Sequence, residues 1–229
     1  MKTISKILAA TIFIIAGVLE ANGTDTAPEI GFLRIINAIA PGNGTTRVLI
    51  DGEDLFPKGY QLGQRSGGIG LAAGTHKVSF EKDGVQSGST KIDLKSGETL
   101  SLIGFAEKIP TSDADAAPRW TIKILKLKQS EPERGFRMTL LSVSEVDEIK
   151  IEALIPEINA IRMAYAKRLK PATIDLGESG HEVMVRVDGK IITTVSPDDP
   201  GNHVVVIYQD AEGKTRAITF FDPSFVIAG

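Results

Sequence analysis

The residues of this sequence best suited to chemistry are histidines close to acidic residues. His203 follows an acidic loop that contains Asp198 and Asp199, and His181 begins an earlier apolar segment. Two imidazoles and a carboxylate suit zinc. These residues form a candidate metal site if the strands around them make a meander that brings both histidines to one end of a sheet. Because their spacing matches no established metal-binding motif, we expect surface histidines beside an acidic loop, with no metal or cofactor.

A third histidine, His76, occupies the same position as His181 in two similar stretches of the sequence. A catalytic histidine would need a partner carboxylate and a nucleophile in each repeat, or a reason for only one repeat to be active. The symmetrical placement of the two histidines therefore predicts a structural role, such as capping the start of a strand. The glycine-rich segment 66–70 lacks the lysine of a phosphate-binding loop, and no Gly-x-Ser-x-Gly sequence is present. We therefore expect no catalytic residues and no enzymatic activity.

Aromatic side chains are the second group with chemical potential, because an exposed ring can stack on a sugar or another small ligand. The chain has 9 Phe, 3 Tyr and 1 Trp. Trp120 lies in an alternating apolar segment, which favours packing in a core. Tyr60, Tyr165 and Tyr208 are therefore the candidate binding residues, and ligand binding would require them to lie on a concave, exposed patch.

Composition limits the class of protein. Of the 229 residues, 42% are apolar and 24% are charged, which is typical of a globular chain. The 26 basic and 29 acidic residues give a net charge of −3, which argues against nucleic-acid binding through phosphate neutralisation. The sequence has no cysteine, which excludes disulfides, thiolate metal sites and cysteine nucleophiles.

The N-terminus has the features of a secretory signal peptide. Lys2 and Lys6 precede an uncharged, mostly apolar run at 7–19, and small residues follow at 21–23. We expect cleavage after Gly23, with cleavage after Ala21 as the alternative. The apolar run is shorter than the roughly 20 residues of a membrane-spanning helix. The mature chain is therefore expected to lack a transmembrane segment and to lie in the periplasm, on the outer surface or in the medium.

Internal repeats organise the remaining sequence. Three blocks recur in the same order about 105 positions later, at low identity. The paired blocks are 31–38 with 135–142, 76–84 with 181–189, and 97–103 with 201–207.

Alternating apolar residues within each repeat predict strands with one buried face, as in Val183, Val185 and Val187. Asp-Gly pairs between such runs predict tight turns. The sequence therefore predicts an all-β chain of two tandem antiparallel immunoglobulin-like β-sandwich domains at 28–128 and 136–229, joined by a linker at 129–135. The segment 156–170 is interpreted as a strand-loop crossover with one helical turn.

Three motifs of the first repeat resemble a known family. L-R-I-I-N-A at 33–38, V-L-I-D-G at 48–52 and L-A-A-G-T-H-K-V at 71–78 are similar to immunoglobulin-like repeats of exported bacterial proteins. Those repeats usually have the pattern L-R-x-x-N-A, V-D-G and L-x-A-G-x-H/Y-x-V, and they have no assigned activity. The second repeat departs from this pattern, since Ser142 replaces Asn-Ala and Glu152-Ala153 replaces Asp-Gly. The resemblance implies a sandwich fold and export.

The sequence thus predicts an exported, non-enzymatic protein of the cell envelope or surface, with a structural, adhesive or pilus-associated role. The expected partners are other envelope or surface proteins or glycans, and a homo-oligomer through edge strands. A carbohydrate-binding or other small-ligand-binding module is the alternative.

Overall fold

The computed structural model describes residues 29–110, 117–129 and 135–222, and within them the chain is all-β. A single 3-10 turn at Pro156–Ile158 is the one helical element of these residues. The all-β prediction is therefore confirmed. The predicted signal peptide at 1–23 and most of the predicted linker lie outside the described residues. No helix among the described residues is long and apolar enough to cross a membrane.

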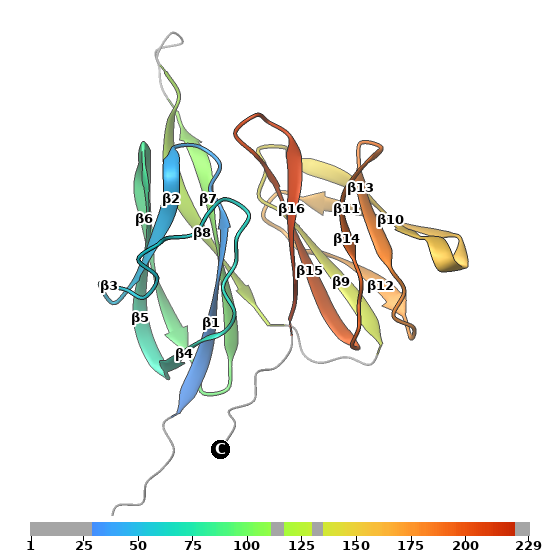
Figure 1. The fold of residues 1–229 in the computed structure, drawn as a ribbon, viewed down its shortest axis with the longest axis horizontal. Coiled ribbons are helices and arrows are strands. Elements are labelled where there is room, and N and C mark those ends of the chain that lie inside the picture. The colour runs from blue at the N-terminus through green and yellow to red at the C-terminus, as the bar shows by residue number, and fades with distance from the viewer. Residues whose placement is uncertain (1–28, 111–116, 130–134, 223–229) are drawn as a thin grey trace, which may run out of the picture.

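The N-terminal half, residues 29–129, forms one curled sheet in the order β3-β2-β5-β6-β8-β7-β1-β4. Figure 1 shows this half in blue to green. Its strands are β1 (Ile30–Ala38), β2 (Asn43–Ile50), β3 (Glu53–Asp54), β4 (Ile69–Ala72), β5 (Gly74–Asp83), β6 (Val85–Leu94), β7 (Thr99–Ile109) and β8 (Arg119–Lys128).

The C-terminal half, residues 135–222, forms two four-stranded sheets in the orders β11-β10-β13-β14 and β12-β9-β15-β16. Its strands are β9 (Phe136–Ser142), β10 (Glu148–Ile155), β11 (Ala160–Lys167), β12 (Ala172–Gly177), β13 (Val183–Val187), β14 (Lys190–Val195), β15 (Gly201–Gln209) and β16 (Thr215–Phe221).

The two halves pair their strands in the same order. β1 pairs parallel with β7 and antiparallel with β4, and β9 pairs parallel with β15 and antiparallel with β12. The groups β3-β2-β5-β6 and β11-β10-β13-β14 also correspond strand by strand. One difference is the parallel pairing of Gln86 in β6 with Thr121 in β8, which joins the two groups of the N-terminal half. The equivalent strands β14 and β16 lie in separate sheets.

Tyr60 and Tyr165 stand 105 positions apart, but they are one position out of register on the equivalent strands. Tyr60 forms a bridge with Thr46 at β2, whereas Tyr165 pairs with Lys150 of β10, next to Ile151, which is the counterpart of Thr46. Their surroundings differ, since Tyr60 is 8% exposed and Tyr165 is 58% exposed. In the N-terminal half, the crossover that contains Tyr60 is mostly loop. In the C-terminal half, the turn at Pro156–Ile158 leads into the regular strand β11, with Asn159 in the left-handed region between them. The expected single helical turn is therefore present.

Each half has its own apolar core. The core of the N-terminal half includes Leu33, Val78 and Phe80, and that of the C-terminal half includes Met138, Ile151 and Val185. These side chains come from the alternating positions that face inward on each strand, as the period of two in the sequence requires.

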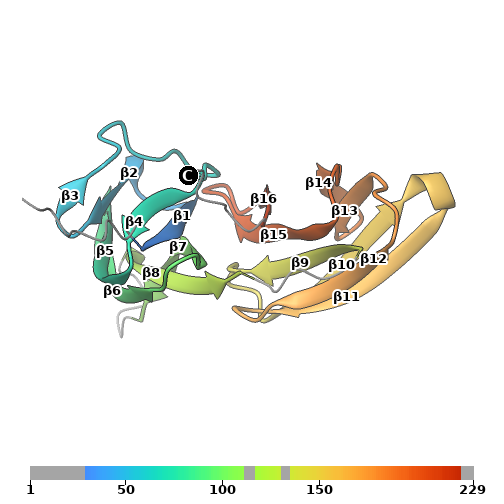
Figure 2. The same ribbon diagram turned by 90° about the horizontal axis from the view of Figure 1, so that it is seen from below.

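A third apolar cluster lies between the halves, where β1 and β7 face β9 and β15 (Figure 2). These four strands are buried on both faces along most of their length. A strand covered on both sides needs apolar residues at successive positions, as in the run at 204–207. The buried members of the cluster are Ile36, Ala38, Ile103, Phe105, Leu141, Val143, Val204, Val206, Tyr208, Ile218 and Phe220.

Candidate functional site

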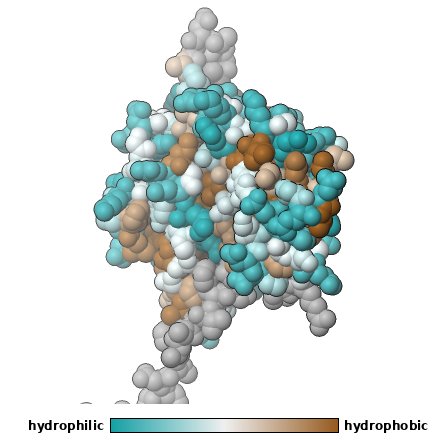
Figure 3. All heavy atoms as spheres, turned by 45° about the vertical axis from the view of Figure 1, so that its right-hand side comes forward, coloured by the Kyte–Doolittle hydropathy of each residue, from teal (hydrophilic) through white to brown (hydrophobic). Residues whose placement is uncertain are grey.

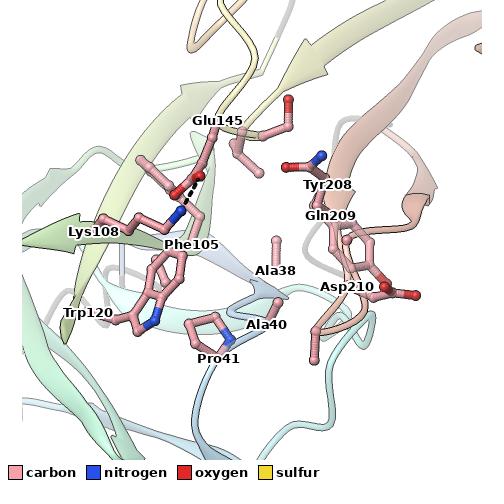
Figure 4. Close-up of a pocket in the computed structure, with 15 residues that line it drawn as sticks. Ala38, Ala40, Pro41, Phe105, Lys108, Trp120, Glu145, Tyr208, Gln209 and Asp210 are labelled. Atoms are coloured by element: carbon pink, nitrogen blue, oxygen red, sulfur yellow. Dashed lines mark hydrogen bonds and ion pairs between the residues drawn. The ribbon is translucent and has the colours of Figure 1, made fainter. Parts of the chain in front are cut away.

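A cleft of about 330 Å³ lies between the two halves, at one end of the third apolar cluster. The ends of β1, β7 and β8 line one side, and the 143–145 loop, the end of β15 and the following hairpin line the other (Figure 4). Both repeats must be present and packed together for this cleft to exist.

Aromatic rings form the apolar part of the cleft. Phe105, Trp120 and Tyr208 all line it. Trp120 is half-buried, and it also packs against the core of the N-terminal half. The prediction that Trp120 is a core residue is therefore only partly right, because Trp120 stands near the start of β8, where the core borders the cleft.

The rim of the cleft carries a salt bridge between the halves. Lys108 Nζ lies 3.0 Å from Glu145 Oε2 and 5.2 Å from the centre of the Trp120 ring. Next to it, Arg168 Nη2 lies 2.6 Å from Glu107 Oε1, and Arg168 Nε donates to the carbonyl of Ser144 at 2.8 Å. Each of these partly exposed pairs contributes little to stability. Together they hold charged side chains in place at the opening of the cleft.

Tyr208 and Asp210 shape the other wall. Burial raises the pKa of the Tyr208 hydroxyl, so this hydroxyl stays protonated at neutral pH. The salt bridge from Arg216 lowers the pKa of Asp210, whose Oδ1 also accepts the backbone N–H groups of Glu212 and Lys214. Asp210 therefore organises the hairpin, and its carboxylate is already engaged by protein donors.

The cleft combines aromatic rings, small apolar residues and a charge pair, which suits the binding of a small amphipathic group. The three candidate tyrosines do not share it. Tyr208 lines the cleft, Tyr60 is buried in the N-terminal core, and Tyr165 is exposed on β11. The sequence prediction missed the cleft because its walls come from both repeats and no local pattern brings them together.

His76 and His181 each bind a carboxylate of the same repeat. His76 Nδ1 lies 2.7 Å from Asp51 Oδ2, and its Nε2 lies 2.8 Å from the carbonyl oxygen of Ala72. These contacts raise the pKa of His76. His181 forms the matching contact with Glu157. Both histidines therefore link the start of a strand region to a preceding turn, which is the structural role that their repeat position predicts.

His203 lines a separate pocket of about 230 Å³ together with Asp198, Asp199 and Arg65. Its ring stacks on Phe221 with 4.8 Å between ring centres, and burial lowers its pKa. The meander that the metal site would require is not formed, because β13 and β14 belong to one sheet and β15 belongs to the other.

The zinc candidate depended on that meander. His181 contacts Glu157, whereas His203 contacts the carbonyl oxygen of Asp199 and the ring of Phe221. Across residues 29–110, 117–129 and 135–222, no three His, Asp or Glu side chains are grouped closely enough to hold a metal ion.

The junction between the halves contains a buried salt bridge. Arg34 Nη1 lies 3.0 Å from Asp222 Oδ1, and both side chains are only 3% exposed. Arg34 also donates to Ser101 Oγ at 3.3 Å and lies over the ring of Phe220, 4.7 Å from its centre. Burial lowers the pKa of Arg34, while Asp222 opposes this effect. Arg34 belongs to the L-R-x-x-N-A motif, and the structure assigns it to the contact between halves.

No protein-family model matches the chain, and no curated protein has a significantly similar sequence.

Proposed function

We propose that this protein is an exported, non-enzymatic component of the cell envelope or surface that works by contact, in a structural, adhesive or pilus-associated role. Its two tandem immunoglobulin-like units, at 28–128 and 136–229, would act as one rigid body. The observation that carries this proposal is the buried junction around Arg34 and Asp222, because an apolar interface with a buried ion pair fixes the orientation of two units. A fixed orientation suits a protein that presents surfaces at a set spacing.

Two features support the tandem arrangement. Each half has its own core, and corresponding strands pair in the same order. The strands are divided between the sheets differently from a constant-type immunoglobulin domain, in which strands 1, 2, 4 and 5 share a sheet. The proposed likeness is therefore one of sandwich architecture, in agreement with the motif resemblance at 31–127.

The use of the polar residues supports contact over catalysis. His76 and His181 are bound to carboxylates of neighbouring turns, and Arg34 is committed to Asp222. Both ring nitrogens of His76 are engaged, one by Asp51 and one by the Ala72 carbonyl, and Arg34 is buried, so these two groups are poorly placed to exchange protons with a substrate.

Cell fractionation tests the export part of the proposal. The chain is expected outside the cytoplasm with its first 21 or 23 residues removed, which the intact mass of the purified protein measures to the residue. A cytoplasmic protein that keeps its N-terminal segment would contradict export.

Small-ligand binding in the cleft, with a carbohydrate as the first class to test, is the second candidate function. The observation that favours it is Trp120, whose ring lines a cleft together with Phe105 and Tyr208. Since Trp120 is the single tryptophan of the chain, its fluorescence reports directly on ligand binding. Saturable quenching by a glycan that is lost in Lys108→Met supports this candidate, and unchanged fluorescence across a glycan panel rejects it for sugars.

A further inference from the structure

β11 carries three large apolar side chains that face solvent. Ile161, Met163 and Tyr165, which we call the β11 stripe, are 58%, 60% and 58% exposed. On the opposite face of the strand, Ala160, Ala164 and Ala166 pack in or against the core. Figure 3, which brings the right-hand side of Figure 1 forward, shows apolar residues scattered among hydrophilic ones on that face of the molecule. An exposed stripe of this kind is unfavourable in water and is typical of an interaction surface.

The same strand is a regular sheet edge. β11 ends the sheet β11-β10-β13-β14 and pairs with β10 at all eight positions without a bulge. Natural edge strands are usually protected by a bulge, a proline, very short length or a charge that covers the edge. β11 contains no proline, and no strand among the described residues pairs with its outer edge. Arg162 reaches across to β12, where it donates to the carbonyl of Asp175. The backbone groups of the outer edge are thus left for pairing with another strand.

The N-terminal half protects the equivalent edge. There the outer strand next to β2 is β3, which has only the two residues Glu53 and Asp54, and Tyr60 is buried beside Thr46. The two repeats share their strand order but differ at this edge. The exposed β11 stripe is therefore a specific property of the second repeat, and the fold does not require it.

We propose that β11 pairs antiparallel with β11 of a second copy of this chain, with Met163 at the two-fold axis. This arrangement joins the two four-stranded sheets into one continuous sheet across the dimer. Antiparallel pairing about Met163 places Ile161 of one copy opposite Tyr165 of the other, so all three residues of the stripe meet apolar partners on one face. An isologous contact of this kind is the usual basis of a homodimer.

Charge and register favour this axis over its neighbours. With Met163 on the axis, Arg162 lies opposite Ala164 and Lys167 lies opposite Asn159, so no like charges face each other. An axis at Tyr165 would place Arg162 opposite Arg168, and like charges directly opposite are destabilising.

An axis at Ile161 is also less favourable, because it would place Tyr165 opposite Glu157 and break the apolar match. The β11 stripe shares no residue with the cleft, so this pairing does not depend on a ligand there, nor does it depend on export.

Engineered cysteines test the register, because the chain has none of its own. Opposite residues of antiparallel strands have Cα atoms about 4.5–5.5 Å apart, within the range that a disulfide spans. We therefore expect the Met163→Cys variant, purified in the form that the cell produces, to give a disulfide-linked dimer on treatment with a mild oxidant. Lys167→Cys on the same strand is the matched control, since its two copies would be roughly 27 Å apart and should stay unlinked.

Paired charges give a second test that does not depend on oxidation. In Ile161→Lys/Tyr165→Lys, lysines face each other across the dimer, and sedimentation should report the mass of one chain. In Ile161→Glu/Tyr165→Lys, opposite charges face each other, and the doubled mass should return. Ile191→Lys, on the same sheet face but on β14, should keep the dimer. A wild-type chain that stays monomeric across a concentration series, or equal cross-linking of both cysteine variants, would overturn the proposal.

Discussion

Arg34 and Asp222 lie 188 positions apart in the chain, yet their side chains form a 3.0 Å salt bridge in the buried junction between the halves. Arg34 stands on β1, in the first repeat, and Asp222 directly follows β16, in the second. The pair therefore connects the beginning and the end of the described fold. Ser101 Oγ and the Phe220 ring also contact the guanidinium, but Asp222 supplies the carboxylate that compensates its charge in this buried position.

Removal of one partner should be costly for this reason. Asp222→Ala leaves the Arg34 guanidinium without its carboxylate, and such a loss in a buried pair destabilises a fold by about 3–5 kcal/mol. We expect that decrease in the free energy of unfolding, measured by urea denaturation. The double variant Arg34→Met/Asp222→Leu should recover most of the loss, because apolar side chains of similar volume suit the junction. If Asp222→Ala were as stable as wild type, the salt bridge would make no contribution to stability.

Gly104 should not tolerate a larger side chain. It lies on β7, and a Cβ atom there would stand 2.7 Å from the Phe80 ring, inside the N-terminal core. We expect Gly104→Ala to lower the unfolding free energy by about 1–3 kcal/mol, as overpacking usually does. Gly67→Ala is the control, since a Cβ atom at Gly67 meets nothing within 4 Å. Equal stability of the two variants would mean that the core adapts to the extra methyl group.

Acid should weaken the fold through His203. Burial holds its pKa in the folded state below the ordinary value of 6.5, so the unfolded chain takes up this proton first as the pH falls. Stability from this group is therefore complete above pH 6.5 and is lost as the pH drops through and below that value. The thermal unfolding temperatures of wild type and His203→Phe should be compared from about pH 8 to about pH 5. The unfolding temperature should fall less steeply with decreasing pH in the variant.

His76 affects stability in the opposite direction. Its raised pKa gives the opposite contribution, present below pH 6.5 and lost as the pH rises through the folded-state pKa. Both proteins in the comparison retain His76, so its contribution cancels. Identical pH profiles of wild type and His203→Phe would refute the assignment to His203.

Strand patterns predicted the fold class well because they depend on neighbouring residues. The alternation of Val183, Val185 and Val187 correctly predicted one buried face. The continuous run at 204–207 carried further information, since strands buried on both faces lose their polar alternation. That run was a signal for the packing of one half against the other.

The candidate site could not be predicted in the same way. Tyr60 and Tyr165 stand 105 positions apart in the sequence, but they pair with the neighbouring strand one position out of register, so one is buried and the other is exposed. Trp120 lines a cleft whose opposite wall, at Tyr208, comes from the other half. The pairing of Arg34 with Asp222 likewise depends on how two cores pack together, which no local pattern of residues specifies.

The proposed function requires the two units to form one rigid body, and the distance between spin labels on the two units measures this most directly. Asp93 on β6 and Glu148 on β10 are exposed, and both can be replaced by cysteine in a chain that has no other. With labelled protein diluted in unlabelled protein, we predict a single narrow distance distribution that broadens in Asp222→Ala. A broad distribution in the otherwise unchanged chain would contradict the account.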